Sequence, residues 1–246
     1  MNNVALVTGA ADGLGAAIAR ALAGRGFRVG LGDIDAAKAA ATAQAIDPAG
    51  KHAVGLTLDV RTEAGFAAAR DALVQRWGAV DALVNNAAVT LATPLFEISV
   101  EEFDAVMAVN ARGTFLGCQV FGRYFKARGQ GRIVNVASLA GQNGGTATGA
   151  HYAASKGAIL TLTKVYAREL AAFGVTVNAV APGPLDLPSV RRLVPADRLD
   201  AVVGGIPVQR LGDAAFVGDI VARLCAEDAG YVTGATWDLN GGLLMR

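Results

Sequence analysis

Short apolar runs rich in β-branched residues alternate along this chain of 246 residues with longer stretches rich in alanine. Runs that are apolar throughout are typical of strands buried on both faces, and strands that alternate with helices form parallel sheets. The expected strands are residues 4–8, 27–33, 53–60, 80–86, 132–138, 175–181 and 235–239. The pattern therefore predicts an α/β fold with a doubly wound parallel sheet and helices on both faces.

The whole chain, residues 1–246, is expected to form one domain, because no change of composition and no linker rich in proline or serine divides it. Apolar residues make up 53%, which is enough for a large core. Two segments, 139–149 and 182–212, show no clear periodicity, and long irregular segments in compact domains often carry function. The proline-rich segment 182–212 is the candidate substrate loop.

Charge and hydropathy exclude several classes of function. The net charge of +1 gives no reason to expect a nucleic acid or an acidic membrane surface as partner. The longest uncharged run, 133–155, contains Asn, Gln, Ser and several glycines, so it is not expected to span a membrane. The first residues lack the basic start and apolar segment of a secretion signal. Cys118 and Cys225 are expected as buried, reduced thiols, which favours a cytoplasmic protein.

A glycine-rich turn, TGAADGLG at residues 8–15, follows the first expected strand. Glycines allow a tight turn and a close approach of the backbone to phosphate, and the helix that follows offers unpaired N–H groups to an anion. The spacing is GxxxGxG rather than GxGxxG, but the preceding strand and following helix favour a dinucleotide site. The expected cofactor-binding residues of this turn are Gly9, Asp12, Gly13, Leu14 and Gly15.

Asp33 ends the second expected strand, about twenty residues beyond the glycine turn. A carboxylate there can accept hydrogen bonds from the adenosine ribose hydroxyls, and its charge repels the 2′-phosphate of NADP. No Arg or Lys adjoins Asp33 in the sequence, and Asp12 adds negative charge near the phosphates. The sequence therefore predicts NAD rather than NADP as cofactor, although an aspartate in this place could also be a simple turn former.

A tyrosine and a lysine stand four residues apart in HYAASKGA, residues 151–158. Four residues are about one helical turn, so Tyr152 and Lys156 share a face and their polar ends can meet. The same spacing also occurs in an ordinary amphipathic helix with one aromatic side chain and one solvated cation. Ser99 followed by Glu102 is a candidate capping box for an earlier helix.

Five short motifs occur in order: TGAADGLG (8–15), NNAA (85–88), Asn110 in VMAVNARG, Ser138 after RIVNVA, and YAASK (152–156). Together they resemble the short-chain dehydrogenase/reductase family in its compact single-domain branch. The last segment, GYVTGATWDLNGG, is most similar to family members that reduce 3-ketoacyl thioesters. The resemblance covers nearly the whole chain. It implies a Rossmann-type fold, hydride transfer between a nicotinamide cofactor and an alcohol or ketone, and a homotetramer.

The resemblance also implies catalytic roles for four residues. Tyr152 would exchange a proton with the substrate oxygen, and Lys156 would lower the pKa of that tyrosine and bond the nicotinamide ribose. Ser138 would orient the reacting oxygen. Asn110 would help to hold a water and the lysine in a proton relay, although an asparagine within a helix is more often a surface residue.

Further cofactor contacts are implied by position in the family pattern: Asp59, Val60, Asn86, Pro182, Gly183 and Leu185, besides Tyr152 and Lys156 themselves. Two positions depart from that pattern. Ala88 stands where glycine is usual, and Leu187 replaces a threonine that often bonds the nicotinamide carboxamide. His151 is expected to start a helix near the site rather than to act as a catalyst, and with no cluster of His, Cys and acidic residues no metal is expected.

The function expected from these residues is an NAD-dependent oxidoreductase that interconverts a secondary alcohol and a ketone, in the direction of alcohol oxidation. Candidate substrates are 3-hydroxyacyl thioesters, cyclic or aromatic secondary alcohols, and sugars. Apolar residues of the substrate loop favour an apolar substrate: Leu185, Leu187, Val190, Leu193 and Val194. One alternative is an NADP-dependent 3-ketoacyl reductase. Another is a non-catalytic NAD-binding regulatory module, which the intact Ser, Tyr and Lys oppose.

Overall fold

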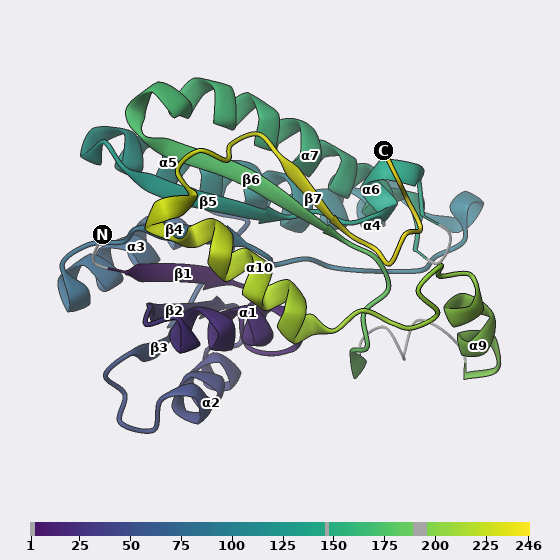
Figure 1. Ribbon diagram of the computed structural model, residues 1–246, viewed down its shortest axis with the longest axis horizontal. Helices are drawn as coiled ribbons and strands as arrows, with labels where there is room; N and C mark the ends of the chain where they lie inside the picture. Colours follow the sequence, from purple (N-terminus) through teal and green to yellow (C-terminus); the bar gives the residue numbers. More distant parts are fainter. Residues whose placement is uncertain (1–2, 146–147, 189–195) are drawn as a thin grey trace.

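The computed structural model describes residues 3–145, 148–188 and 196–246, and their strands form one parallel sheet in the order β3-β2-β1-β4-β5-β6-β7 (Figure 1). The strands are β1 Val4–Thr8, β2 Arg28–Asp33, β3 Ala53–Thr57, β4 Ala82–Asn85, β5 Gly131–Val136, β6 Val175–Pro182 and β7 Thr236–Leu239. Every expected strand is present, and the predicted doubly wound α/β fold is confirmed.

Helices cover both faces of the sheet. Those on one face are α1 Gly13–Gly24, α2 Ala36–Ile46 and α10 Ala214–Cys225, and those on the other are α3 Glu63–Trp77, α5 Gly113–Arg128 and α7 Ala150–Leu170 (Figure 1). The remaining helices are α4 Val100–Met107, α6 Ala140–Asn143 and α9 Ala196–Gly204, the π-helix η2 Ala108–Arg112, and the 3₁₀ turns η1 Leu95–Glu97, η3 Ala171–Phe173 and η4 Glu227–Ala229. In the described residues no helix is long and apolar enough to cross a membrane.

The core has two halves, one on each side of the sheet. Successive side chains of a strand point to opposite faces of the sheet, and strand β1 shows this. Val7 packs on the side of α1 and α10, while Leu6 packs on the side of α3 and α5. Both side chains are fully buried. Each buried Leu or Val of this kind contributes about 1.5–3 kcal/mol of transfer free energy, so the central strands hold the fold together. Cys118 and Cys225 are both buried and free, as expected.

Strand ends differ from the expected ones by a few residues, for a reason visible in the ladders. The strand expected over 53–60 stops at Thr57, because its partner β2 ends at Asp33, which pairs with Thr57. The strand expected over 132–138 ends at Val136, so Ser138 lies in the loop beyond it. The two segments without periodicity contain the short helices α6 and α9. Val190, Leu193 and Val194 of the substrate loop lie outside the described residues.

Strand order reverses at β1, which pairs with β2 on one side and β4 on the other. Crossovers from neighbouring strands leave to opposite faces at such a point, and the crevice that opens beyond the carboxyl ends is where α/β sheets bind ligands. Thr8 is the last residue of β1 and Asn85 is the last residue of β4. The fold therefore places the loops after β1, β4, β5 and β6 around one crevice.

Candidate functional site

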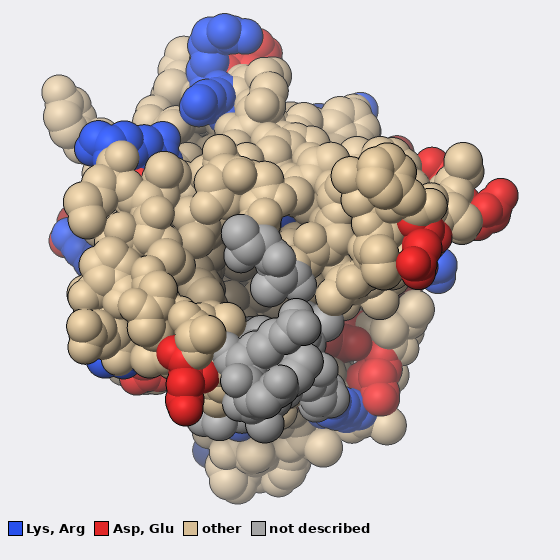
Figure 2. Space-filling view, turned by 90° about the vertical axis from the view of Figure 1, so that its right-hand side faces the viewer, with Lys and Arg blue, Asp and Glu red and all other residues tan. Residues whose placement is uncertain are grey.

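A cleft of about 1220 Å³ lies at the carboxyl ends of the strands. The expected site residues that line it are Gly9, Asp12, Gly13, Leu14, Gly15, Asp33, Asp59, Val60, Asn86, Ser138, Tyr152, Lys156, Pro182, Gly183 and Leu185. Figure 2 shows the side of the molecule on which the strands end, where much of the described surface is uncharged. The fold thus gathers residues at or beyond the ends of strands β1 to β6, together with two residues of helix α7, into one cavity.

The glycine turn between β1 and α1 has the conformation that its sequence predicts. Gly9 and Gly13 have φ values of +62° and +53°, which side chains rarely allow. A methyl group on Gly15 would overlap the carbonyl oxygen of Gly9, whereas one on Gly13 would meet no atom within 4 Å and would enter open space. Asp12 does not cap α1 with its side chain. The first turn of α1 therefore presents its N–H groups to the cleft, as an anion site requires.

Asp33 is oriented by two backbone donors. Its Oδ2 accepts from the Ala11 N–H at 3.0 Å and its Oδ1 accepts from the Asp35 N–H at 3.1 Å. Basic side chains are nearer than the sequence suggests, because Lys38 reaches across from α2. Its ammonium is paired with Asp12, whose hydrogen bond and charge raise the pKa of Lys38. At this end of the cleft the Lys38 ammonium is therefore paired with Asp12, and the Asp33 carboxylate accepts from backbone N–H groups.

Asp59 and Arg61 form a second pair beside this end of the cleft. Arg61 Nε donates to Asp59 Oδ1 at 2.9 Å and its Nη2 donates to Oδ2 at 2.7 Å, and these bonds lower the pKa of the Asp59 carboxyl. Both residues line the cavity. The two-bonded geometry fixes the plane of the guanidinium group. Sequence reasoning missed Arg61, although a basic residue two positions after an expected ligand residue could have drawn attention to it.

Asn86 ties β4 to the glycine turn. Its Nδ2 donates to the carbonyl oxygens of Thr8 and Gly9, each at 3.0 Å, and the Thr8 hydroxyl accepts from the Asn86 N–H at 3.0 Å. The side chain also lines the cleft. The two hydrogen bonds from the Asn86 side-chain amide hold the backbone of the glycine turn in place. Ala88, in the position where glycine is usual, also lines the cleft.

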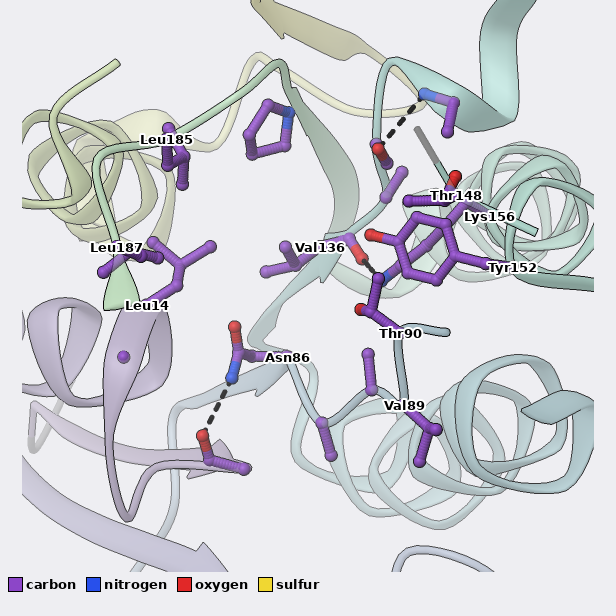
Figure 3. A pocket seen from close by; sticks show the side chains of 18 of the residues that line it. Leu14, Asn86, Val89, Thr90, Val136, Thr148, Tyr152, Lys156, Leu185 and Leu187 are labelled. Carbon is purple, nitrogen blue, oxygen red and sulfur yellow. Dashed lines mark hydrogen bonds between the residues drawn. The ribbon is translucent and has the colours of Figure 1, made fainter. Parts of the chain in front are cut away.

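Tyr152 and Lys156 lie together on the first turns of α7 (Figure 3). Ser138, in the loop after β5, belongs to the same cleft. The Lys156 ammonium is 5.6 Å from the centre of the Tyr152 ring and donates to the Val136 carbonyl at 2.7 Å. Ser138 Oγ accepts from the Ala140 N–H at 3.1 Å, so its own proton remains available for another acceptor. The tyrosine hydroxyl hydrogen-bonds to Ser138. The expected Ser, Tyr and Lys are thus brought together.

Lys156 is expected to lower the pKa of Tyr152, but in the protein alone burial has the larger effect on that pKa. Burial raises the pKa of Tyr152, and hydrogen bonds with Ser138 and Thr90 act against that rise. Burial also lowers the pKa of Lys156 to about 7. Both shifts arise because a site shielded from water disfavours whichever form is charged. In the protein alone, Tyr152 is therefore held in its neutral form at pH 7.

Asn110 is fully buried, which corrects the alternative of a surface asparagine. It sits in the π-helix η2, and π-turns are frequent at functional sites. Its Oδ1 accepts from the Val89 N–H at 2.8 Å, and its Nδ2 donates to the Val89 carbonyl and to Ser155 Oγ, each at 3.0 Å. The side chain therefore fastens the loop after β4 to α7. In these bonds it holds neither Lys156 nor Tyr152.

In the loop after β6, three backbone N–H groups donate to carbonyl oxygens of the protein. The Gly183 N–H donates to Leu239 at 3.0 Å, and the Leu187 N–H donates to Leu185 at 2.9 Å. The Asp186 N–H donates to Gly212 at 2.9 Å. Leu185 and Leu187 both line the cleft with apolar side chains (Figure 3). Leu187 therefore offers the cleft only apolar contact from its side chain.

Thr90 is a site residue that sequence reasoning missed. It lines the cleft beside Tyr152, and the two side chains are hydrogen-bonded (Figure 3). A signal was present, since Thr90 follows the NNAA motif by two residues in a loop at the carboxyl end of a strand. Only the fold shows that the Thr90 hydroxyl, in the loop after β4, lies next to Tyr152 on α7.

Comparison with known proteins agrees with this geometry. A family model described as Enoyl-(Acyl carrier protein) reductase matches residues 9–244. The chain is 41% identical to 2-(R)-hydroxypropyl-CoM dehydrogenase of Xanthobacter autotrophicus, over 98% of both chains. The chain belongs to the short-chain dehydrogenase/reductase family.

Other relatives span the chain equally well. A 3-oxoacyl-acyl-carrier-protein reductase of Vibrio cholerae is 40% identical over 98% of this chain and 97% of its own. A (3R)-3-hydroxyacyl-CoA dehydrogenase of Rattus norvegicus is 36% identical over 98% of this chain and 96% of its own. The expected family is confirmed. The protein is an oxidoreductase acting on CH–OH groups, in a family that binds nicotinamide cofactors.

Proposed function

We propose that this protein is an NAD-dependent dehydrogenase that interconverts a secondary alcohol and a ketone, with Tyr152 as proton donor and acceptor. The observation that carries the choice of NAD is the Asp33 carboxylate at the end of β2, held toward the cleft by two backbone N–H groups. A carboxylate in this place receives ribose hydroxyls well and repels a 2′-phosphate.

The residues of the cleft fit a dinucleotide. The open space at Gly13, the strained φ values of the turn and the free start of α1 suit a pyrophosphate. Asp59, Val60 and Asn86 would hold the adenosine side, and Lys156 would hold the nicotinamide ribose. A bound nicotinamide dinucleotide supplies the hydride acceptor or donor of the reaction.

The chain's own groups would handle the proton. In alcohol oxidation Tyr152 accepts the substrate hydroxyl proton, which requires its phenolate form, and in ketone reduction it donates that proton. Ser138, whose Oγ accepts from the Ala140 N–H, would donate its hydroxyl proton to the reacting oxygen in place of its hydrogen bond with Tyr152. A protonated Lys156 favours the phenolate by its charge. Because burial opposes both charged forms, we infer that additional positive charge within the cleft is needed for full activity.

An apolar substrate suits the substrate end of the cleft. Charged side chains among the described residues that line the cavity are Asp12, Asp33, Asp59, Arg61 and Lys156. Apart from Lys156 they come from the loops after β1, β2 and β3. Leu139, Leu187, Val202 and Leu243 line the other parts of the cavity. Candidate substrates are therefore 3-hydroxyacyl thioesters and cyclic or aromatic secondary alcohols.

A second candidate function is an NADP-dependent 3-ketoacyl reductase. It is favoured by the relative named 3-oxoacyl-acyl-carrier-protein reductase and by the cations Lys38 and Arg61 near the adenosine end. Each of these cations is paired with a carboxylate, Asp12 or Asp59, which leaves less positive charge for a 2′-phosphate. We therefore place NAD first. A cytoplasmic location, one catalytic domain over residues 1–246 and a homotetramer complete the proposal.

The test is nicotinamide absorbance with purified protein, NAD or NADP, and 3-hydroxybutyryl-CoA or cyclohexanol. Reduction of NAD in preference to NADP with either alcohol is expected. The Tyr152→Phe variant keeps the ring but removes the hydroxyl, so its turnover should fall by about 10²- to 10⁴-fold while NADH still binds. Normal turnover by that variant would rule out the mechanism and favour a different proton donor.

A further inference from the structure

His151 stands immediately before the candidate catalytic tyrosine and is fully buried. Its Nδ1 accepts a hydrogen bond from the Tyr152 backbone N–H at 2.9 Å, a proton that the Gly149 carbonyl also approaches at 3.1 Å. Its Nε2 lies 2.8 Å from Oε1 of Glu102, on the neighbouring helix α4. Both ring nitrogens are therefore engaged, one by the backbone of α7 and one by the side chain of another helix.

These two partners determine where the ring proton sits. A nitrogen that accepts from an N–H group carries no proton, so Nδ1 is unprotonated. The neutral ring then has its proton on Nε2, where it donates to the Glu102 carboxylate. Hydrogen-bond partners of this kind select one tautomer and one ring orientation. His151 is thus held as an Nε2–H imidazole that points in a single direction.

Glu102 extends the connection to the loop that carries Thr90. Its backbone N–H donates to Ser99 Oγ at 3.1 Å, which caps α4, while its carboxylate accepts from the Thr93 side chain and from His151, and these bonds lower its pKa. The expected capping box is therefore half formed, with the glutamate turned to His151. The Gly149 N–H donates to the Leu91 carbonyl at 2.8 Å.

Close packing leaves the ring little freedom. A methyl group built on Gly149 would overlap the His151 ring, so the turn before α7 has room for the imidazole only because residue 149 is glycine. The ring and Glu102 thus join α7, α4 and the loop after β4, and that loop also carries Thr90, a hydrogen-bond partner of the Tyr152 side chain. A buried histidine could also merely fill the core, and that alternative predicts no effect confined to turnover.

We propose that His151 is a positioning residue, which through Glu102 fixes the first turn of α7 and thereby the place of the Tyr152 hydroxyl relative to Ser138 and Thr90. The inference rests on the proposed role of Tyr152. Nothing in it requires His151 to touch the substrate. A shift of the tyrosine by about 1 Å can cost a hundredfold in rate, so loss of this connection should appear in kcat.

The first experiment reads the tautomer. The chain has two histidines, so long-range imidazole ¹⁵N spectra of the wild type and of His52→Asn assign the His151 signals without ambiguity. An Nε2–H tautomer is expected, and it should persist in Tyr152→Phe. An Nδ1–H tautomer would overturn the proposal whatever the enzyme's activity, which separates this result from a failure of the proposed function.

The second experiment uses a matched pair at Glu102. Glu102→Gln keeps an oxygen that accepts from Nε2–H, so kcat should stay within about threefold, whereas Glu102→Leu should lower kcat by about ten- to a hundredfold. Both should bind NADH within about twofold of the wild type, because the cofactor end is untouched. His151→Leu should resemble Glu102→Leu, and the double variant should lose no more than either single one. Equal kcat values for Glu102→Gln and Glu102→Leu would overturn the proposal, even if His151→Leu fails to fold.

Discussion

At the scale of single residues, the site depends on Tyr152 and Lys156, two groups whose surroundings disfavour their charged forms. Tyr152 and Lys156 could be located from sequence, because their spacing and the surrounding motifs are short and local. Their pKa shifts could not, since burial and the bond from Lys156 to the Val136 carbonyl depend on β5 and α7 meeting. Thr90 was missed for the same reason, because its partner Tyr152 is distant in the chain. Asn110 was expected as a site residue, but its burial could not be foreseen from the sequence.

The lowered pKa of Lys156 predicts how stability changes with pH in the cofactor-free protein. Its folded pKa of about 7 lies below the ordinary value of 10.5, so the unfolded chain binds more protons between these limits. The free energy of unfolding must then rise with pH across that window. From pH 7 to pH 9 this group contributes an increase of about 2 kcal/mol.

Denaturant unfolding at pH 7 and pH 9 measures this change, with Lys156→Met as the matched variant. Methionine cannot titrate, so the variant should lose the rise of about 2 kcal/mol that the wild type shows. The variant also has no Lys156 ammonium to bury at pH 7, so it is free of that energetic cost. An identical pH slope in both proteins would contradict the assignment of a buried, weakly basic lysine.

At the scale of elements, strand positions were predictable and strand ends were not. Continuous apolar runs mark a buried parallel strand wherever they occur, but a strand ends where its neighbour stops offering partners, as β3 does at Thr57 opposite Asp33. The glycine turn was predictable because its backbone conformation requires glycine at given positions, as the φ of Gly13 shows. The helices α6 and α9 lie in segments without periodicity, where only tertiary contacts decide.

Two glycines of α1 give a matched test of the turn. A methyl group on Gly15 would overlap the Gly9 carbonyl, whereas on Gly24, at the exposed end of the same helix, it would meet no atom within 4 Å. Gly15→Ala should therefore distort the turn and weaken NADH binding by about tenfold or more. A tenfold change in the dissociation constant corresponds to about 1.4 kcal/mol. Gly24→Ala should leave binding unchanged and raise the free energy of unfolding by about 0.5–1 kcal/mol.

Fluorescence titration with NADH and denaturant unfolding give the two readouts for both variants. Equal effects of the two substitutions on NADH binding would show that Gly15 is not required by the turn.

At the scale of the whole molecule, a continuous sheet brings loops from across the chain to one cleft. The doubly wound parallel sheet was predictable from the alternation of strands and helices, whereas the order of its strands comes from the structure. The substrate was not predictable, because the residues that would contact it come from loops such as 182–212, whose conformation follows from packing against the rest of the fold. The change to Leu187 acts at this scale, since it makes that wall of the cleft apolar.

A homotetramer is the expected assembly. Phe115 on α5 and Val165 on α7 are exposed apolar side chains, and we propose that these two long helices take part in the subunit interface. Light scattering should give a mass about four times the 25.0 kDa of the chain. Replacement of Phe115 by Glu should shift the mass downward, because a charge in an interface core is unfavourable. A wild-type mass near 25.0 kDa would contradict this assembly.

The relative affinity for NADH and NADPH tests the central claim most directly, and it requires no knowledge of the substrate. Asp33 should make the wild type bind NADH about tenfold or more tightly than NADPH, because its carboxylate receives ribose hydroxyls and repels the 2′-phosphate. Asp33→Ala should weaken NADH binding and bring the two dissociation constants together. Tighter binding of NADPH by the wild type, or an unchanged ratio in Asp33→Ala, would contradict the account.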